Sequence, residues 1–140
     1  DLVKSKAAEQ DIIIMTAAVA DFCPSHPADE KIKKNDSSYE SVIELERTED
    51  ILSYLGAHKA KGQLICGFSM ETQNMLENSK AKLAKKNADM IVANNLKVAG
   101  AGFGTDTNVV TLITADDCTE LEIMDKSCVA ARIMDRLLKM

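Results

Sequence analysis

The apolar and polar residues of the chain are arranged in blocks that predict strands and helices in turn. Short apolar runs rich in β-branched residues have the length of strands, and segments with apolar residues three or four apart predict helices. The predicted strands are 12–15, 42–46, 63–69, 88–93, 109–114 and 118–123. One predicted helix begins near Thr48, a second spans about 71–86 and a third ends the chain. The pattern of residues 1–9 indicates the last turns of another helix. This order predicts an α/β fold: a mainly parallel sheet flanked by helices, with an antiparallel hairpin near the C-terminus.

The same pattern predicts which positions are buried. Strand 12–15 has no polar position, so both of its faces should be covered, whereas strand 42–46 alternates with acidic residues and should have one wet face. Gly67, near the end of its strand, should permit the close approach of a ligand or another backbone. The residues expected on the buried helix stripes are Ile51, Leu52, Leu55, Met75, Leu76, Leu83, Val129, Ile133, Met134, Leu137 and Leu138.

The segment after strand 12–15 contains the main candidates for ligand-binding residues. Ala17, Ala18 and Ala20 are too small to fill a core, so a flat ligand has room beside the backbone there. Asp21 supplies a carboxylate for a hydroxyl, an amine or a metal, and the lysines of 31–34 suit phosphate oxygens. Ligands of open α/β sheets bind at the carboxyl ends of strands. The order favours a nucleotide site, although an Asp after a strand is often a turn former and clustered lysines are often a solvated surface.

Composition limits the classes of function. A chain of 140 residues with 46% hydrophobic content suits a single domain with an ordinary core. A net charge of −5 argues against a nonspecific nucleic-acid binder. No apolar run approaches the roughly 20 residues of a membrane span. The four cysteines contain no C-x-x-C pair, and only His26 lies near Cys23, so we expect reduced thiols, no zinc site and a cytoplasmic protein.

The glycines do not form a known phosphate-binding fingerprint. Gly100, Gly102 and Gly104 lack the G-x-G-x-x-G spacing, follow no predicted strand directly and open no helix. A Walker motif is also absent from the sequence. The absent glycine fingerprint weighs against a nicotinamide-dependent dehydrogenase, which we keep as a third hypothesis.

Six ordered sequence blocks resemble the phosphopantothenoylcysteine synthetase family, the synthetase half of the bacterial bifunctional coenzyme A biosynthesis flavoprotein. They are A-A-V-A-D-F (17–22), K-I-K-K (31–34), T-E-D-I-L (48–52), G-F-S-M-E-T (67–72), K-L-A-K-K with A-D-M-I-V-A-N (82–94) and G-F-G-T-D-T-N (102–108). The resemblance implies a Rossmann-like sheet and a ligase that joins 4′-phosphopantothenate to cysteine. CTP would be the co-substrate and Mg²⁺ the cofactor. The carboxylate would first form an acyl-cytidylate with loss of pyrophosphate, and the cysteine amine would then displace CMP.

The resemblance also assigns roles to individual residues. Lys31, the first lysine of K-I-K-K, would be catalytic, and positive charge there would stabilise the charge that builds up as the carboxylate attacks the α-phosphate. Asp21 would hold the nucleotide or its Mg²⁺. The implied nucleotide-binding residues are Ala17, Ala18, Asp21, Phe68, Lys82 and Lys86. The implied substrate-binding residues are Asn94, Phe103, Asp106 and Asn108.

Family members begin with a glycine-rich strand-turn-helix segment that residues 1–15 do not match. We therefore expect residues 1–140 to be one N-terminally truncated synthetase domain, inactive on its own if that segment is needed. Ser69 and Met70 stand where the family often has two alanines, which leaves CTP against ATP selectivity open. The resemblance implies a homodimer and a possible fused phosphopantothenoylcysteine decarboxylase domain, which alone would carry FMN. The alternative is a noncatalytic nucleotide-binding or dimerisation module.

Overall fold

The computed structural model describes residues 2–31, 42–71, 74–95, 98, 102 and 104–140. Phe103 and three residues of the K-I-K-K motif (32–34) therefore lie outside the described residues. The chain divides into two compact units, one of Asp1–Thr16 with Ile51–Met140 and one of Ala17–Asp50. Each unit is described by itself below.

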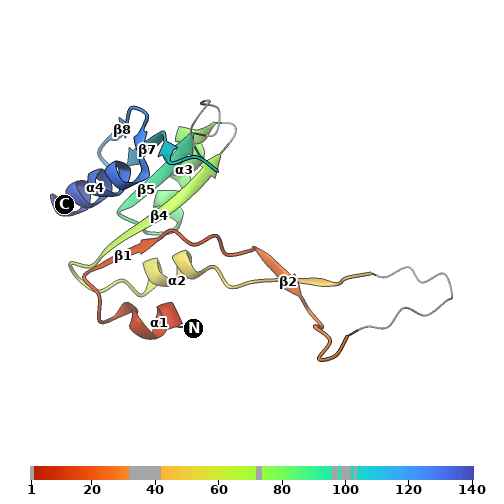
Figure 1. The fold of residues 1–140 in the computed structure, drawn as a ribbon. Helices are drawn as coiled ribbons and strands as arrows, with labels where there is room; N and C mark the ends of the chain where they lie inside the picture. Colours follow the sequence, from red (N-terminus) through yellow and green to blue (C-terminus); the bar gives the residue numbers. More distant parts are fainter. Residues whose placement is uncertain (1, 32–41, 72–73, 96–97, 99–101, 103) are drawn as a thin grey trace. The chain divides into compact units, whose positions relative to one another are not determined.

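The larger unit is built on a five-stranded sheet (Figure 1). Its strands lie in the order β1 (Ile12–Met15), β4 (Leu64–Glu71), β5 (Met90–Asn95), β7 (Val110–Ile113) and β8 (Cys118–Glu120). β1 pairs parallel with β4, and β4 pairs parallel with β5. β7 is antiparallel to both β5 and β8. The predicted α/β fold with a hairpin near the C-terminus is confirmed.

Helices cover both faces of this sheet. On one face, α2 (Ile51–Ala57) and α3 (Met75–Lys85) pack on side chains such as Ile65 and Ile91. On the other face, α4 (Lys126–Leu137) places Val129, Ile133 and Leu137 against Cys66 and Val92. The short α1 (Leu2–Ala7) contributes Ala7 to the packing beside α2. Among the described residues, every helix is too short or too polar to cross a membrane.

Three predicted core positions are wrong. Leu76, Met134 and Leu138 are 47%, 38% and 70% exposed. Each lies one residue beyond a position that does face the sheet, and one residue turns a side chain by about 100° around a helix. Since α4 meets the sheet along a single row at every fourth residue, the stripe is narrower than its apolar content indicates.

Strand β1 is also less buried than predicted. Within it only Ile13 is buried. Both faces are nevertheless partly covered, because Ile12 and Ile14 pack against one apolar cluster and Ile13 and Met15 against another, while β1 lies at an edge of the described sheet and pairs with β4 alone.

Two glycines permit close packing, one predicted and one missed. A Cβ on Gly67 would lie 2.7 Å from Cδ2 of Leu52, so the close neighbour there is helix α2 and not a ligand or a backbone. A Cβ on Gly56 would lie 1.8 Å from the carbonyl oxygen of Lys86. Asn87 Nδ2 also donates to the Gly56 carbonyl at 2.8 Å, so the ends of α2 and α3 meet backbone to backbone.

Two further strands, β6 (Thr107–Asn108) and β9 (Met124–Asp125), form an antiparallel pair that the sequence pattern did not predict. Each has only two residues, too few to show an alternating pattern. They join the turn before β7 to the residues that lead into α4.

The smaller unit is an antiparallel ribbon of β2 (Phe22–Pro24) and β3 (Leu45–Arg47). The predicted strand 42–46 is shifted, since Val42 and Ile43 precede β3, and β2 lies in a segment predicted as loop. All of β3 is exposed, so the expected buried face is absent from this unit. Thr48, predicted to cap the next helix, instead donates its hydroxyl to the Ala20 carbonyl and its N–H to the Asp21 carbonyl at 3.0 Å.

We expect Gly56→Ala to destabilise the protein by about 2 kcal/mol or more, because the new methyl group would overlap a backbone oxygen that cannot move independently. Without this overlap, Ala would stabilise a helix by about 1 kcal/mol relative to Gly, so the sign of the change in unfolding free energy is informative. Urea unfolding measures the change. Ala57→Ser, at the exposed next position, is the matched control and should be near neutral. A stabilised Gly56→Ala variant would contradict the close approach of α2 and α3.

The cysteines should differ in reactivity. Burial, with a smaller contribution from Asp89, raises the pKa of the Cys66 thiol to about 12. Because the thiolate is the nucleophile, Cys66 of the folded protein should resist iodoacetamide at neutral pH. Cys118 and Cys128 are exposed and should be alkylated first. Peptide mass spectrometry after timed labelling checks this order, and equal labelling of Cys66 would show that its strand opens readily.

Candidate functional site

The carboxyl ends of β4 and β5 bring several predicted site residues together. Met70 lies opposite Asn94, and Phe68 lies opposite Val92. Since side chains alternate along a strand, Phe68, Met70 and Asn94 share the face that α4 covers further down. Phe68 is half-buried against the apolar cluster, while Met70 is 52% exposed. The covered face therefore opens to solvent at the ends of the two parallel strands, where ligands of open α/β sheets bind.

Two predicted substrate-binding residues contact each other there. Asn108 Nδ2 donates to Asn94 Oδ1 at 2.9 Å, and the Val109 N–H donates to Asn108 Oδ1 at 2.9 Å. Both asparagines are half-buried. The structure thus brings together residues that are 14 positions apart and that reach this point from β5 and β6.

The turn before β6 is fastened by backbone contacts. The Thr105 hydroxyl lies 3.2 Å from the Gly102 carbonyl and 3.0 Å from the Thr107 carbonyl. Lys126, the first residue of α4, donates its N–H to the Asp106 carbonyl at 2.9 Å and its ammonium to the Thr105 carbonyl at 2.5 Å. The Asp106 residue itself is exposed. Thus α4 holds the turn, and the Asp106 carboxylate is accessible to a ligand.

Lys82 on α3 and Lys86, the residue that caps its C-terminal end, reach neighbouring elements. Lys82 Nζ donates to the Phe68 carbonyl of β4 at 2.9 Å, and Lys86 Nζ donates to Ser53 Oγ of α2 at 2.9 Å. Both lysines are half-buried. A fully solvated helix face does not describe them, because each ammonium has a protein partner. Lys82 carries its charge to the carboxyl half of β4, beside the predicted base-packing residue.

Sequence reasoning missed a buried hydroxyl pair beneath this edge. Ser69 and Ser79 are both buried, and their Oγ atoms lie 2.8 Å apart. A hydrogen bond between buried polar groups ties the start of α3 to β4. The signal was present in Ser79, a polar residue four positions after Met75 and four before Leu83 on the inward stripe. It could have been read as a buried partner for a strand residue.

The smaller unit holds the remaining predicted residues. Ala17, Ala18, Asp21 and Lys31 are all exposed. The backbone carbonyl of Asp21 accepts a hydrogen bond from the Thr48 N–H. The Asp21 residue is exposed, so its carboxylate is accessible. No group of three or more His, Cys, Asp or Glu residues among those described could hold a metal. Asp21 therefore offers a single carboxylate, a donor set that fits Mg²⁺ only together with phosphate oxygens, which is a common mode for that ion.

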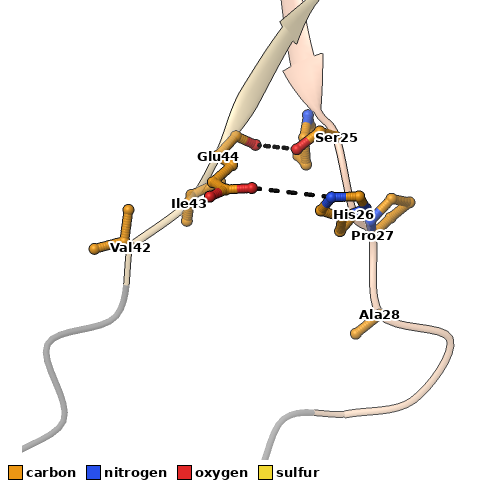
Figure 2. Close-up of a pocket in the computed structure, with 8 residues that line it drawn as sticks. Ser25, His26, Pro27, Ala28, Val42, Ile43 and Glu44 are labelled. Carbon is orange, nitrogen blue, oxygen red and sulfur yellow. Dashed lines mark hydrogen bonds and ion pairs between the residues drawn. The ribbon is translucent and has the colours of Figure 1, made fainter.

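The ribbon also contains a pocket of about 430 Å³ (Figure 2). It opens between the segments around Pro27 and Ile43 and is lined mostly by apolar side chains. Ser25 donates to the Glu44 carbonyl, and His26 faces the Glu44 carboxylate at 3.9 Å. No predicted site residue lines this pocket. A second cavity of about 470 Å³, between β8 and α4, contains none either.

Comparison with curated proteins places these residues in a known context. The chain is 48% identical over 128 residues to the coenzyme A biosynthesis bifunctional protein CoaBC of Bacillus subtilis. The match covers 91% of the chain and 31% of that protein. It is 47% identical over 131 residues to a cysteine/cysteine sulfinic acid decarboxylase of an unknown prokaryotic organism, covering 93% of the chain and 36% of that protein. The chain spans about a third of the length of these curated relatives.

Solved structures agree with the fold. The crystal structure of the C-terminal domain of CoaBC matches 99% of the chain and 61% of its own length, with a TM-score of 0.76 and 41% identity. A Cab2 mutant in complex with phosphopantothenate-cysteine matches 98% of the chain and 48% of its own length, with a TM-score of 0.65. At 19% identity this second likeness concerns the fold alone. The chain matches the family over residues 1–140 and belongs to the DNA/pantothenate metabolism flavoprotein C-terminal domain family.

Proposed function

We propose that this chain is the synthetase part of an enzyme that ligates 4′-phosphopantothenate with cysteine, at the expense of CTP, in coenzyme A biosynthesis. The observation that carries the proposal is the 48% identity to CoaBC across 91% of the chain. The relative structure in complex with phosphopantothenate-cysteine, although alike only in fold, is consistent with it.

Within this proposal, the family resemblance divides the roles between the residues. Phe68 would pack near the base, with Lys82 supplying charge for the triphosphate at the end of β4, where its ammonium already lies beside a carbonyl. Lys86 would assist Lys82. Ala17 and Ala18 would leave room for the nucleotide beside the backbone, and Asp21 would hold it. Asn94, Asp106 and Asn108 would contact substrate from the end of β5 and the turn before β7, and Phe103, which lies outside the described residues, is proposed with them on the family resemblance alone.

The chemistry asked of these residues is electrostatic. The 4′-phosphopantothenate carboxylate attacks the α-phosphate of CTP, pyrophosphate leaves, and the cysteine amine then displaces CMP from the acyl-cytidylate. Lys31 would face the charge that grows on the phosphate oxygens during the first step, where fixed positive charge lowers the barrier most. Mg²⁺, bound by Asp21 together with the triphosphate, would neutralise phosphate charge.

The ribbon supports the further proposal that the enzyme is a homodimer. Its larger apolar side chains are exposed: Phe22 by 49%, Ile43 by 72% and Leu45 by 59%. An exposed apolar surface rimmed by polar groups is typical of a protein interface. A second copy is the partner we propose, since a two-stranded ribbon is marginally stable alone. We also propose a cytoplasmic location and, in the complete protein, a fused decarboxylase domain that carries the FMN.

The rival function is a noncatalytic nucleotide-binding or dimerisation module. Calorimetric titration of CTP with Mg²⁺, with ATP as competitor, is the first test of the nucleotide site, and pyrophosphate release on addition of 4′-phosphopantothenate separates the enzyme from the module. Saturable binding without turnover by the complete gene product would favour the module.

Lys31→Ala should lower CTP-dependent pyrophosphate release by about 10²–10³-fold, the usual cost of removing one group that stabilises transition-state charge. The matched control is Lys61→Ala, because Lys61 is an exposed lysine in the connection between α2 and β4. Product formation is followed by pyrophosphate detection in the complete gene product. Equal rates for the two variants would remove Lys31 from the catalytic step.

Ile43→Asp should shift the protein from dimer to monomer, because the substitution places a charge within the apolar face of the ribbon. Light scattering coupled to size-exclusion chromatography measures the mass. Leu138→Asp is the control, since Leu138 is 70% exposed on the last turn beyond α4. An unchanged dimer in both variants would exclude the ribbon as the interface.

A further inference from the structure

The hydrogen bonds of Asn94 and Asn108 determine which atom each amide presents. The Val109 backbone N–H can only donate, so the Asn108 atom that faces it at 2.9 Å must be the oxygen. The other end of the Asn108 amide is then its NH₂ group, which can also only donate. Asn94 must therefore turn its oxygen toward Asn108, as observed at 2.9 Å. One backbone N–H thus fixes the orientation of two side chains in series.

This arrangement determines which group the Asn94 amide presents away from Asn108. With its oxygen held by Asn108, Asn94 presents its NH₂ group, and no described residue accepts a hydrogen bond from it. The amide is half-buried, so its donors are only partly available to water. A half-buried donor with no acceptor among the described residues costs free energy unless another group, such as a ligand or water, accepts from it.

The frame around the pair is held by backbone contacts. The Asn95 N–H donates to the Val109 carbonyl at 3.0 Å, which ties β5 to the residue after Asn108. Asn108 itself is paired with Met124 in the β6–β9 ladder. Because both asparagines are held through their backbones, the amide of Asn94 has a defined direction before any ligand arrives.

We propose that Asn108 is a positioning residue that fixes the polarity of the Asn94 amide, so that Asn94 donates a hydrogen bond to an acceptor oxygen or nitrogen of a bound substrate. The inference rests on the proposed function, in which CTP and 4′-phosphopantothenate both carry such acceptors. Phe68 and Met70 lie on the same face of the sheet as Asn94, and Met70 is 52% exposed, so a substrate has access to this donor.

Asn108→Asp is the decisive variant. The carboxylate still accepts from the Val109 N–H, but it presents an oxygen toward Asn94 where the wild type presents a donor. Asn94 must then turn its NH₂ group toward residue 108 and its oxygen toward the substrate. Every internal hydrogen bond is kept, while the outward polarity of Asn94 is reversed and one negative charge is added at residue 108. A merely structural role for Asn108 therefore predicts no effect on substrate binding.

We expect Asn108→Asp to raise the KM of one substrate by roughly tenfold or more, since a substrate acceptor would face an oxygen instead of a donor. The melting temperature should change little. Asn108→Ser removes the amide without adding charge and leaves Asn94 able to adopt both orientations. If these are equally populated, the KM should rise by only about twofold. In an Asn94→Ala background, Asn108→Asp should cost nothing more, because its effect acts through Asn94.

The assay uses the complete gene product, and each KM is measured with the other substrates saturating. A raised KM for CTP assigns the acceptor to the nucleotide, and a raised KM for 4′-phosphopantothenate assigns it to the acyl substrate. The measurements are repeated at about 0.05 M and 0.5 M salt, because repulsion by the new carboxylate would be screened and a reversed amide would not. A KM equal to that of the wild type, or a rise that disappears at high salt, would overturn the proposal.

A second readout does not depend on turnover. In ¹⁵N–¹H spectra, the Asn94 side-chain NH₂ signal, assigned by its loss in Asn94→Ala, should shift when the substrate that owns the acceptor is added. No shift with either substrate would also overturn the proposal. A wild-type protein that releases no pyrophosphate contradicts the proposed function, whereas an active wild type with an inert Asn108→Asp substitution contradicts only the role of Asn108.

Discussion

Strand β5 pairs on both sides and is covered on both faces, and the larger unit is organised around that burial. Its first four residues, Met90 to Ala93, have no exposed surface. They join the parallel strands β1 and β4 to the antiparallel strands β7 and β8. The covered part of β5 carries only apolar side chains, and its first polar residue lies where the cover ends. That residue is Asn94, and the candidate site lies there for this reason.

Strong local patterns were sufficient to predict the framework of this unit. The apolar run that ends at Asn94 and the stripe of Val129, Ile133 and Leu137 both have the periodicity of the element that forms. Exact burial was harder to predict, because it depends on how wide a stripe the neighbouring element covers. Met134 is apolar and lies beside the stripe, yet it is 38% exposed. The periodicity of apolar residues is a property of one helix or strand, whereas the burial of a side chain also depends on the element that packs against it.

The site was only partly accessible from sequence. Asn94 and Asn108 were named through family resemblance, but no pattern shows that two amides 14 residues apart meet, because β6 and β9 are too short to leave a signal. The Ser69–Ser79 pair was missed because serines score as polar wherever they occur. The ribbon of the smaller unit was misread for a different reason. Ile43 and Leu45 alternate like residues with a buried face, but both are exposed among the described residues of that unit.

The contact between Lys126 and the turn at Thr105 and Asp106 links the end of the chain to the candidate site. Through it, α4 is fastened to the segment that carries Asn108, while its buried row is fastened to the sheet beneath Phe68. A substitution in the last helix that tilts or shortens it would therefore be transmitted to both sides of the candidate site. A sequence change in this C-terminal helix would therefore act on the candidate site as well as on stability, although none of its side chains was expected to touch a substrate.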